Sequence, residues 1–513
     1  MLKNVIEKSV ILLFCFSMII TLFGSFRSSI LFSPDMKAGP LLVLLFVFFL
    51  VSCVMVYKGF RYRLNNAFLY LKDRFWANRR IITLLLSILV FIAQLIVIKT
   101  VSAPISWDVG SIYGGVQAMP DSEYISNYLS INPNNSFFFF IMYLCNKIMN
   151  FLVSGNIGWV HWQLFNALVL DISFVVLSKA ASNLFSVKIG YTVFYFSLFS
   201  LSLSPWILVP YTDTFSFGLI SSIFLIYSIY RCSIKKSAKV VLRILLSVLI
   251  GLAFLLKPSS IIFFIAWTLF KAVELIYEEK KSVQVHKLFV FIQSIILFLS
   301  AIIFFNLFLN HQKLVSIDDE QAKPSIHFIM MGMKNDGGYN QEDVDTVNAI
   351  NGKENKKAYI SKEIRMRLKD FGFLGYMKFL MKKHFNNTSN GDFGWGRDGR
   401  PQVPGEVATS KFQSILRDWY YQQGNRVNNI RFFMHIIWLG VLSSSLFTVF
   451  IKTSDKKMSQ LIYIMMLSVI GIFLYLLIFE GGRSRYLIQY LPIFFMLAGI
   501  GAQTLIQRLS AKK

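Results

Sequence analysis

Residues 81–98 read IITLLLSILVFIAQLIVI, eighteen positions without a charged side chain. The hydrocarbon core of a bilayer is about 30 Å thick, and a helix needs about 20 apolar residues to cross it. This stretch is therefore predicted to be a membrane-spanning helix. Arginines lie directly before it and a polar segment follows it, which is the usual surrounding of a membrane span.

The composition agrees with a chain built from many such helices. Of 513 residues, 55% are hydrophobic and only 15% are charged, whereas soluble domains carry about 25% charged residues. A water-soluble enzyme, a disordered protein and a disulfide-stapled secreted domain are therefore not expected. The formal charge of +25 comes from short basic clusters between apolar runs, so it indicates membrane topology and not nucleic-acid binding.

We predict an all-α polytopic membrane protein with about 12 transmembrane helices. The apolar segments begin near positions 10, 40, 81, 159, 189, 213, 240, 259, 287, 431, 459 and 486. The first segment lacks a small-residue cleavage site, so it is predicted to remain as an anchor and not to be removed as a signal peptide.

The doubtful segment is 137–151, FFFFIMYLCNKIMNF, whose unbroken apolar run is short. If it crossed the membrane, the basic cluster at 231–243 would fall outside the cell. If it lies along the interface, every strong basic cluster, including that at 58–80, falls inside. The positive-inside rule therefore favours a segment lying flat on the outer face. It predicts a multi-pass protein of the cell membrane with both termini in the cytoplasm.

This topology divides the chain into four parts. Residues 1–80 form an N-terminal two-helix extension with a basic cytoplasmic loop, and residues 81–310 form a membrane core with the outer loop 102–158. Residues 311–430 form a polar extracytoplasmic insert with irregular turns and one amphipathic helix, predicted from Ala358 to Lys383. Residues 431–513 return to the membrane as three helices.

The outer loop begins SAPISWDVGSIYGGVQAMPDSEYISNYLSINPNNSFFFF at residues 102–140. Asp108 lies about seven residues beyond the end of the preceding span, next to Trp107, so its carboxylate is expected near the lipid headgroups. A carboxylate at that level can act on a substrate that straddles the interface. The alternative is an ordinary solvated acid after a helix.

An outer loop with Asp108, an aromatic at Tyr113, an Asn/Pro stretch at 132–135 and a short interfacial apolar helix resembles the GT-C glycosyltransferases. It is most similar to the protein O-mannosyltransferase and aminoarabinose-transferase type, including Gram-positive integral-membrane proteins. The resemblance covers most of residues 81–506, with the outer insert and the late EGGRSRYLIQYLP stretch. It departs from the family at Val109, where a second acid often follows the first.

The resemblance implies an inverting glycosyltransferase that moves a sugar from a polyprenyl-phosphate donor to an extracytoplasmic glycan, wall polymer or protein. Asp108 would be the general base that takes the proton of the acceptor hydroxyl. A role that needs a second carboxylate would fall to Asp121 or Glu123. The remaining residues of this loop that would contact substrate are Tyr113, Asn134 and Asn135.

The leaving phosphate needs cations, and Arg483 and Arg485 lie in the predicted outer turn before the last span. Two arginines beside glycines can form charge-assisted hydrogen bonds to phosphate oxygens; the alternative is a snorkelling pair that fixes the depth of the helix. Lys257, at another outer turn, is a further phosphate candidate, or else an interface anchor.

Three other segments carry candidate substrate-binding residues. Tyr211 and Asp213 follow the outer turn that starts at Pro205, where Asp213 could equally cap a helix. The insert segments that begin at His327 and His384 gather Gly, Asn, Asp and aromatic residues, and such loops suit sugar hydroxyls and the apolar faces of sugar rings.

Two other functions use the same features. A flippase or transporter of a lipid-linked saccharide is one alternative, although such proteins carry charged residues along a path in the membrane. A polymerase of lipid-linked saccharides is the other, and only the length of the product separates it from a transferase that adds one sugar. The expected partners are the polyprenyl-phosphate sugar, the outer acceptor and the bilayer, with no nucleic acid. No cofactor is implied, and metal dependence is left open.

Overall fold

The computed structural model describes residues 2–33, 49, 52, 58–120, 122–153, 155–276 and 281–511, and these residues form helices and connecting turns without a strand. Nine of the helices in these ranges are long and apolar enough to cross a membrane. They are α1 (Leu2–Phe26), α3 (Lys58–Val101), α7 (Trp159–Leu184), α9 (Thr212–Cys232), α10 (Lys236–Leu256), α12 (Lys281–His311), α18 (Val427–Leu446), α19 (Lys456–Ile478) and α20 (Leu491–Ala511).

These nine helices coincide with nine of the twelve predicted segments. The segment near 189 forms α8 (Val187–Ser197) and a π-helical turn, η2 (Leu198–Ser202), and the segment near 259 forms η4 (Pro258–Ile261) and α11 (Ile262–Ile276). At 1.5 Å per residue, α8 and α11 are each shorter than a 30 Å hydrocarbon core. The segment near position 40 lies outside the described residues.

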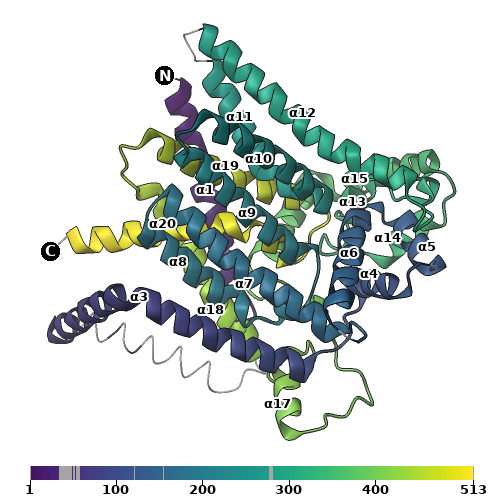
Figure 1. Cartoon of the computed structure of the whole chain (residues 1–513), viewed down its shortest axis with the longest axis horizontal. Coiled ribbons are helices and arrows are strands. Elements are labelled where there is room, and N and C mark those ends of the chain that lie inside the picture. The colour runs from purple at the N-terminus through teal and green to yellow at the C-terminus, as the bar shows by residue number, and fades with distance from the viewer. Residues whose placement is uncertain are drawn as a thin grey trace.

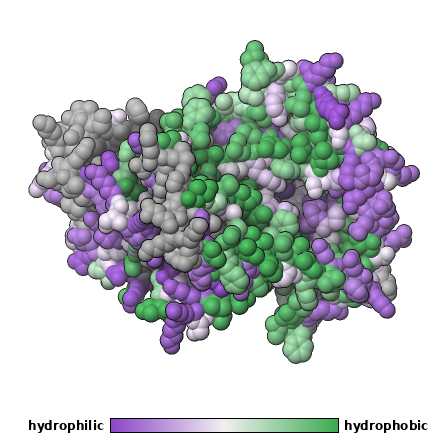
Figure 2. Space-filling model, turned by 90° about the horizontal axis from the view of Figure 1, so that it is seen from above, coloured by the Kyte–Doolittle hydropathy of each residue, from purple (hydrophilic) through white to green (hydrophobic). Residues whose placement is uncertain are grey.

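The surface has the apolar belt that a bilayer requires. Figure 2 shows a broad hydrophobic band between two hydrophilic ends. Large apolar side chains on the spans point outward, and the Phe304 side chain on α12 is 76% exposed. In water such a belt would aggregate, whereas in lipid it needs no further cover. The prediction of an all-α polytopic membrane protein is confirmed.

The centre of the bundle is α20, which packs against α8, α18 and the turn η6 (Phe447–Phe450). Around it, α7 packs against α8 and α9, α10 lies between α9 and α12, and α11 packs on α19. Both chain ends lie on the left of Figure 1, whereas the insert helices α13–α15 lie on the right. The insert therefore covers the end of the bundle opposite to the termini.

The basic stretch 58–80, which was predicted as a loop, is helical and forms the first half of α3. Its Arg, Lys, Leu and Ala residues are good helix formers, so the helix of the following span continues through them. The Arg79 guanidinium lies 5.7 Å from the centroid of the Trp76 ring on the same helix, as expected for basic and aromatic residues at a membrane surface.

The outer loop contains three helices, α4 (Trp107–Ala118), α5 (Glu123–Ile131) and α6 (Ser136–Leu152). Ser122 caps α5 by accepting a hydrogen bond from the Ile125 amide. A short 3-10 turn, η1 (Pro133–Asn135), links α5 to α6 and begins with proline, whose fixed φ favours a helix start. Figure 1 shows α6 crossing the direction of the spans at the insert end of the bundle. Its placement flat on the outer face stays a prediction.

Between η2 and α9 the chain is not an α-helix, although it is buried. This break contains η3 (Pro205–Leu208). Amides on neighbouring spans satisfy its carbonyl groups: Gln94 donates to Ser202 O, Gln163 to Leu208 O, and Asn166 to Trp206 O and Ile207 O. Irregular backbone at membrane depth needs such partners, so the predicted outer turn from Pro205 is a buried element of the bundle.

The insert is a helical cover. It comprises η5 (Asp319–Gln321), α13 (Ile326–Met331), α14 (Gln341–Asn348), α15 (Lys353–Thr388), α16 (Trp395–Asp398) and α17 (Lys411–Tyr420). The predicted amphipathic helix is α15, and it extends beyond the predicted range at both ends. Gly372 kinks it with φ 57°, a left-handed conformation that glycine adopts without steric cost. The second half of α15 packs against α1 and α19.

Candidate active site

Asp108 lies in the first turn of α4 and accepts a hydrogen bond on each carboxylate oxygen. The Tyr128 hydroxyl on α5 donates to Oδ1 at 2.7 Å, and the Tyr211 hydroxyl donates to Oδ2 at 2.9 Å. Asn135 joins the two tyrosines, because its Nδ2 donates to the Tyr128 oxygen at 2.6 Å and its Oδ1 accepts from Tyr211 at 3.3 Å. The carboxylate is thus held in one orientation and keeps further lone pairs free.

Burial raises the pKa of both tyrosines well above the usual range, and the nearby Asp108 carboxylate raises it further. Both hydroxyls therefore remain protonated and act as donors. The Asp108 side chain itself is half-buried, so its free lone pairs can reach a ligand. The four residues Asp108, Tyr128, Asn135 and Tyr211 are called the aspartate cluster below.

Trp107, directly before Asp108, adopts φ 54°. A bulky residue in this region is an outlier that costs about 1–3 kcal/mol and persists only when its surroundings fix it. The Trp107 ring packs edge-to-face on Tyr211 at 5.1 Å, and the Arg485 guanidinium lies over it at 4.6 Å. The strained turn therefore aims the Asp108 carboxylate at Tyr211 and the Trp107 ring at Arg485.

Arg485 lies in η7 (Ser484–Tyr490), the turn that leads into α20. Its side chain is 9% exposed and lies 3.5 Å from Asp213 and 3.4 Å from Asp398. The Arg485 guanidinium lies over the rings of Trp107 and Tyr211, and the Tyr211 hydroxyl donates to Asp108. The structure therefore brings the predicted base and a predicted phosphate ligand to one site at the insert end of the bundle.

Arg483 and Lys257 complete a cationic group. Arg483 pairs with Asp398, and Lys257 pairs with Asp213. Burial lowers the pKa of Lys257, and the Asp213 carboxylate opposes this shift. The Nε donors of Arg483 and Arg485 are buried and make no hydrogen bond in the part of the chain that the structure describes, although Arg485 Nε lies 3.5 Å from Asp213 Oδ2. Buried donors without partners are rare in proteins, so the Arg483 Nε is available to an anionic ligand, whereas the Arg485 Nε faces Asp213.

The loop that carries the arginines is fixed by the insert. Gly481 N donates to Gly337 O at 2.8 Å, Gly482 N donates to Asn387 Oδ1 at 2.6 Å, and Arg397 donates to Gly482 O at 3.0 Å. Gly482 has φ 73°, and a Cβ there would lie 2.5 Å from Gly338 N. Only glycine fits this crossing of two backbones.

Lys383 on α15 fastens the insert to the end of α19. It is fully buried, and its ammonium donates to three carbonyl oxygens, those of Gly332 at 2.7 Å, Leu477 at 3.0 Å and Phe479 at 2.6 Å. Burial lowers the pKa of Lys383 to about 8, against the attraction of Glu480. At pH 7 the ammonium therefore still has the three protons that match its three acceptors.

The other predicted residues lie elsewhere or make structural contacts. The Tyr113 hydroxyl donates to Ile157 O at 3.3 Å, and Glu123 and Asn134 are exposed on α5 and η1. His384 bonds to Thr21 of α1 at 2.9 Å. His327 is fully buried in the insert, and burial together with Lys323 lowers its pKa to about 4. Asp121 lies outside the described residues.

Three members of the site were not singled out from the sequence, namely Tyr128, Asp398 and the strained Trp107. Tyr128 lies 20 positions after Asp108 and meets it only because α4 and α5 fold back on each other. Asp398 lies in the Gly-rich segment that begins at His384, predicted to bind sugar, and here its carboxylate pairs with Arg483 and Arg485. The glycines in the sequence indicated that this segment could bind a ligand, but no sequence feature indicated that the arginines would pair with it.

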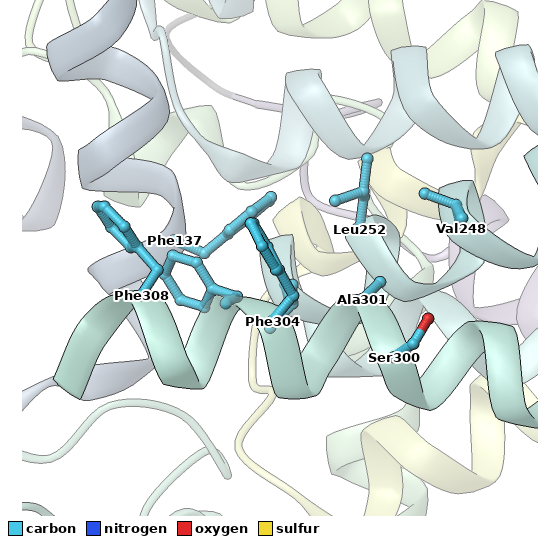
Figure 3. A pocket seen from close by; sticks show the side chains of 9 residues that line it. Phe137, Val248, Leu252, Ser300, Ala301, Phe304 and Phe308 are labelled. Atoms are coloured by element: carbon cyan, nitrogen blue, oxygen red, sulfur yellow. The ribbon is translucent and has the colours of Figure 1, made fainter. Parts of the chain in front are cut away.

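An apolar groove of about 500 Å³ lies between α10, α12 and the first residue of the FFFF run on α6 (Figure 3). Phe137, Leu252 and Phe304 are among its lining residues. The next residue of α6, Phe138, packs edge-to-face on Tyr211 at 5.9 Å. Neighbouring residues of one helix thus contact the groove and the cluster.

The fold and this site define a class of protein, the polytopic helical membrane proteins with a buried polar site. Here the site consists of ion pairs and lies at the end of the bundle that the insert covers. Residues 2–506 match the family described as conserved hypothetical integral membrane protein, and the chain belongs to this family. No curated protein and no solved structure matches the chain.

Proposed function

We propose that this protein is an inverting glycosyltransferase that moves a sugar from a polyprenyl-phosphate donor to an acceptor hydroxyl at the membrane surface. The observation that carries the proposal is the meeting of Asp108 with Arg485 across Trp107 and Tyr211. A carboxylate and a buried guanidinium group thus lie close together at the insert end of the bundle.

In the proposed reaction the acceptor oxygen attacks the anomeric carbon, and its proton passes to Asp108. The bond from the anomeric carbon to the phosphate oxygen breaks, and polyprenyl phosphate leaves with the electron pair. General-base assistance of this kind contributes about 10²–10⁴-fold. With a single carboxylate on the attacking side, direct displacement inverts the anomeric centre, by analogy with single-displacement glycosidases.

Arg483, whose Nε makes no hydrogen bond in the described residues, and Arg485 are proposed to bind the leaving phosphate. Guanidinium groups suit phosphate oxygens because they offer several donors in one plane. Asp213 and Asp398 keep the cations paired before the donor binds, since an unpaired buried charge is costly. The apolar groove offers a surface for the prenyl chain of such a donor, since Phe137 lines the groove and the next residue, Phe138, packs on Tyr211.

The decisive variant is Asp108→Asn in proteoliposomes supplied with a panel of polyprenyl-phosphate hexoses. Release of polyprenyl phosphate is expected to fall at least 100-fold, while insertion and thermal unfolding stay near those of the parent protein. Asp319→Asn, which alters an exposed acid in η5, is the matched control and should release phosphate at the parent rate. Full activity in Asp108→Asn would contradict the mechanism.

The phosphate role is tested with Arg485→Lys, which keeps the charge and loses the planar fork. We expect the KM for the polyprenyl-phosphate donor to rise about ten-fold, equivalent to about 1.4 kcal/mol. Arg431→Lys is the control, because Arg431 pairs with Asp392 outside the cluster. An unchanged donor KM in Arg485→Lys would leave this residue with an anchoring role only. Movement of the lipid-linked sugar across the bilayer without release of polyprenyl phosphate would favour the flippase alternative.

A further inference from the structure

The second half of α15 has two unlike faces. Phe379, Lys383 and Asn387 are buried on one of them. The opposite face exposes large apolar side chains, with 77% exposure for Phe373, 73% for Leu374, 43% for Met377 and 44% for Met381. These four exposed residues, called the α15 stripe below, share one side of the helix over slightly more than two turns.

The α15 stripe continues from a segment that is packed at the ends of two spans. His384 bonds to Thr21 of α1, and Asn387 Nδ2 donates to Leu476 O near the end of α19 at 2.8 Å. Gly24 of α1 packs directly against Phe385, since a Cβ on Gly24 would lie 2.4 Å from that ring. The end of α15 is therefore level with the last turns of α1 and α19, next to the apolar belt of the spans.

The charges around the stripe fit a lipid surface. Lys369, Lys378 and Lys382 are exposed on this part of α15, and Asp370 is the one acid between residues 369 and 382. Lysines beside exposed apolar and aromatic side chains are typical of helices that lie in the headgroup layer, with their ammonium groups near lipid phosphates. A protein partner would not explain why the stripe begins where α15 leaves the spans.

We propose that the α15 stripe lies in the interfacial layer of the bilayer leaflet on the insert side, so that the kinked helix holds the insert onto the membrane. The kink at Gly372 turns Phe373 and Leu374 outward at the far end of the stripe. This proposal concerns the lipid contact of the insert and does not depend on the proposed enzymatic activity.

The test measures the depth of a nitroxide by power-saturation EPR in phosphatidylglycerol-containing proteoliposomes. The full chain carries Leu374→Cys, with the native cysteines replaced by serine. Two reference sites are Phe304→Cys on the lipid-facing surface of α12 and Thr346→Cys on the exposed surface of α14. We expect the ratio of oxygen to nickel-chelate accessibility at position 374 to exceed that at position 346 several-fold, and to lie below that at position 304.

A ratio at position 374 equal to that at position 346 would overturn the proposal, because the stripe would then lie in water. Low accessibility to both reagents would also overturn it, since a protein surface would then cover the stripe. If the Leu374→Cys variant is not incorporated into the membrane, the label is placed instead at Lys378→Cys, an exposed lysine of the same helix. The label there should report a depth in the headgroup layer, and a water value would count against the proposal in the same way.

Discussion

Asp108 is held on both of its oxygens, and this arrangement decides what the residue can do. A free surface carboxylate samples many rotamers, whereas two tyrosine hydroxyls and Asn135 fix this one. A carboxylate positioned in this way suits a general base.

Removing one of these hydrogen bonds should slow the reaction more than it affects folding. We expect Tyr211→Phe to lower the rate of polyprenyl-phosphate release about ten-fold, from the loss of one hydrogen bond worth about 1–1.5 kcal/mol. Tyr124→Phe is the control, because Tyr124 lies on α5 near Tyr128 but donates to Ser111. Single-turnover measurements on both variants check this. Equal rates for the two would mean that Tyr211 does not orient the carboxylate.

Sequence reasoning found Asp108, Tyr211, Asn135 and the arginines because each lies at an end of an apolar run, where polar groups meet the interface. It could not pair them. The contact of Asp108 with Tyr211 joins positions 103 apart, and no local periodicity encodes such a contact. The strained backbone at Trp107 could not be predicted from the sequence either, since the residues that adopt positive φ are mostly Gly, Asn or Asp.

At the scale of elements, the loop between α19 and α20 depends on close backbone packing. Two glycines let it cross the insert backbone near Gly337 and Gly338, and the arginines follow within three residues of Gly482. The spans on either side were predictable from runs of about 20 apolar residues. The buried break before α9 was not, because its apolar sequence looks like a span, and only the amides of α3 and α7 show how its carbonyls are satisfied.

Gly482→Ala tests the crossing. The added Cβ would meet backbone atoms and would also require φ 73°, so we expect a loss of about 1–3 kcal/mol in unfolding free energy together with reduced activity. Gly440→Ala in α18 is the matched control, since its nearest neighbour lies 4.0 Å away, and it should be neutral or slightly stabilising. Thermal unfolding in detergent compares them. A parent-like melting temperature for Gly482→Ala would show that the loop can move.

At the scale of the whole molecule, the insert and the bundle act as one body. Lys383 joins the ends of α13 and α19, and Arg431 joins the insert to α18 through Asp392. Cations are favoured at helix C-termini, where carbonyl groups lack partners. The division into membrane core and polar insert was readable from composition, but the composition gave no sign that the insert positions the arginines.

Lys383→Met should weaken the attachment of the insert to the end of α19. Three buried carbonyl groups lose their donor, and each such group costs about 1–3 kcal/mol. We therefore expect a lower melting temperature and faster hydrogen exchange in residues 479–485. Lys362→Met, at an exposed position in the first half of α15, is the control and should exchange like the parent. Unchanged protection of 479–485 in Lys383→Met would show that the other hydrogen bonds suffice.

The order of the site residues along the chain has a consequence for biosynthesis. Asp108 and Tyr211 leave the ribosome long before Asp398, and the arginines at 483 and 485 come after nearly all of the other spans. A nascent chain therefore has an incomplete centre until its closing helices have been inserted. Fragments that stop short of them would carry Asp108 without Arg483 and Arg485, and so would lack the proposed ligands of the phosphate.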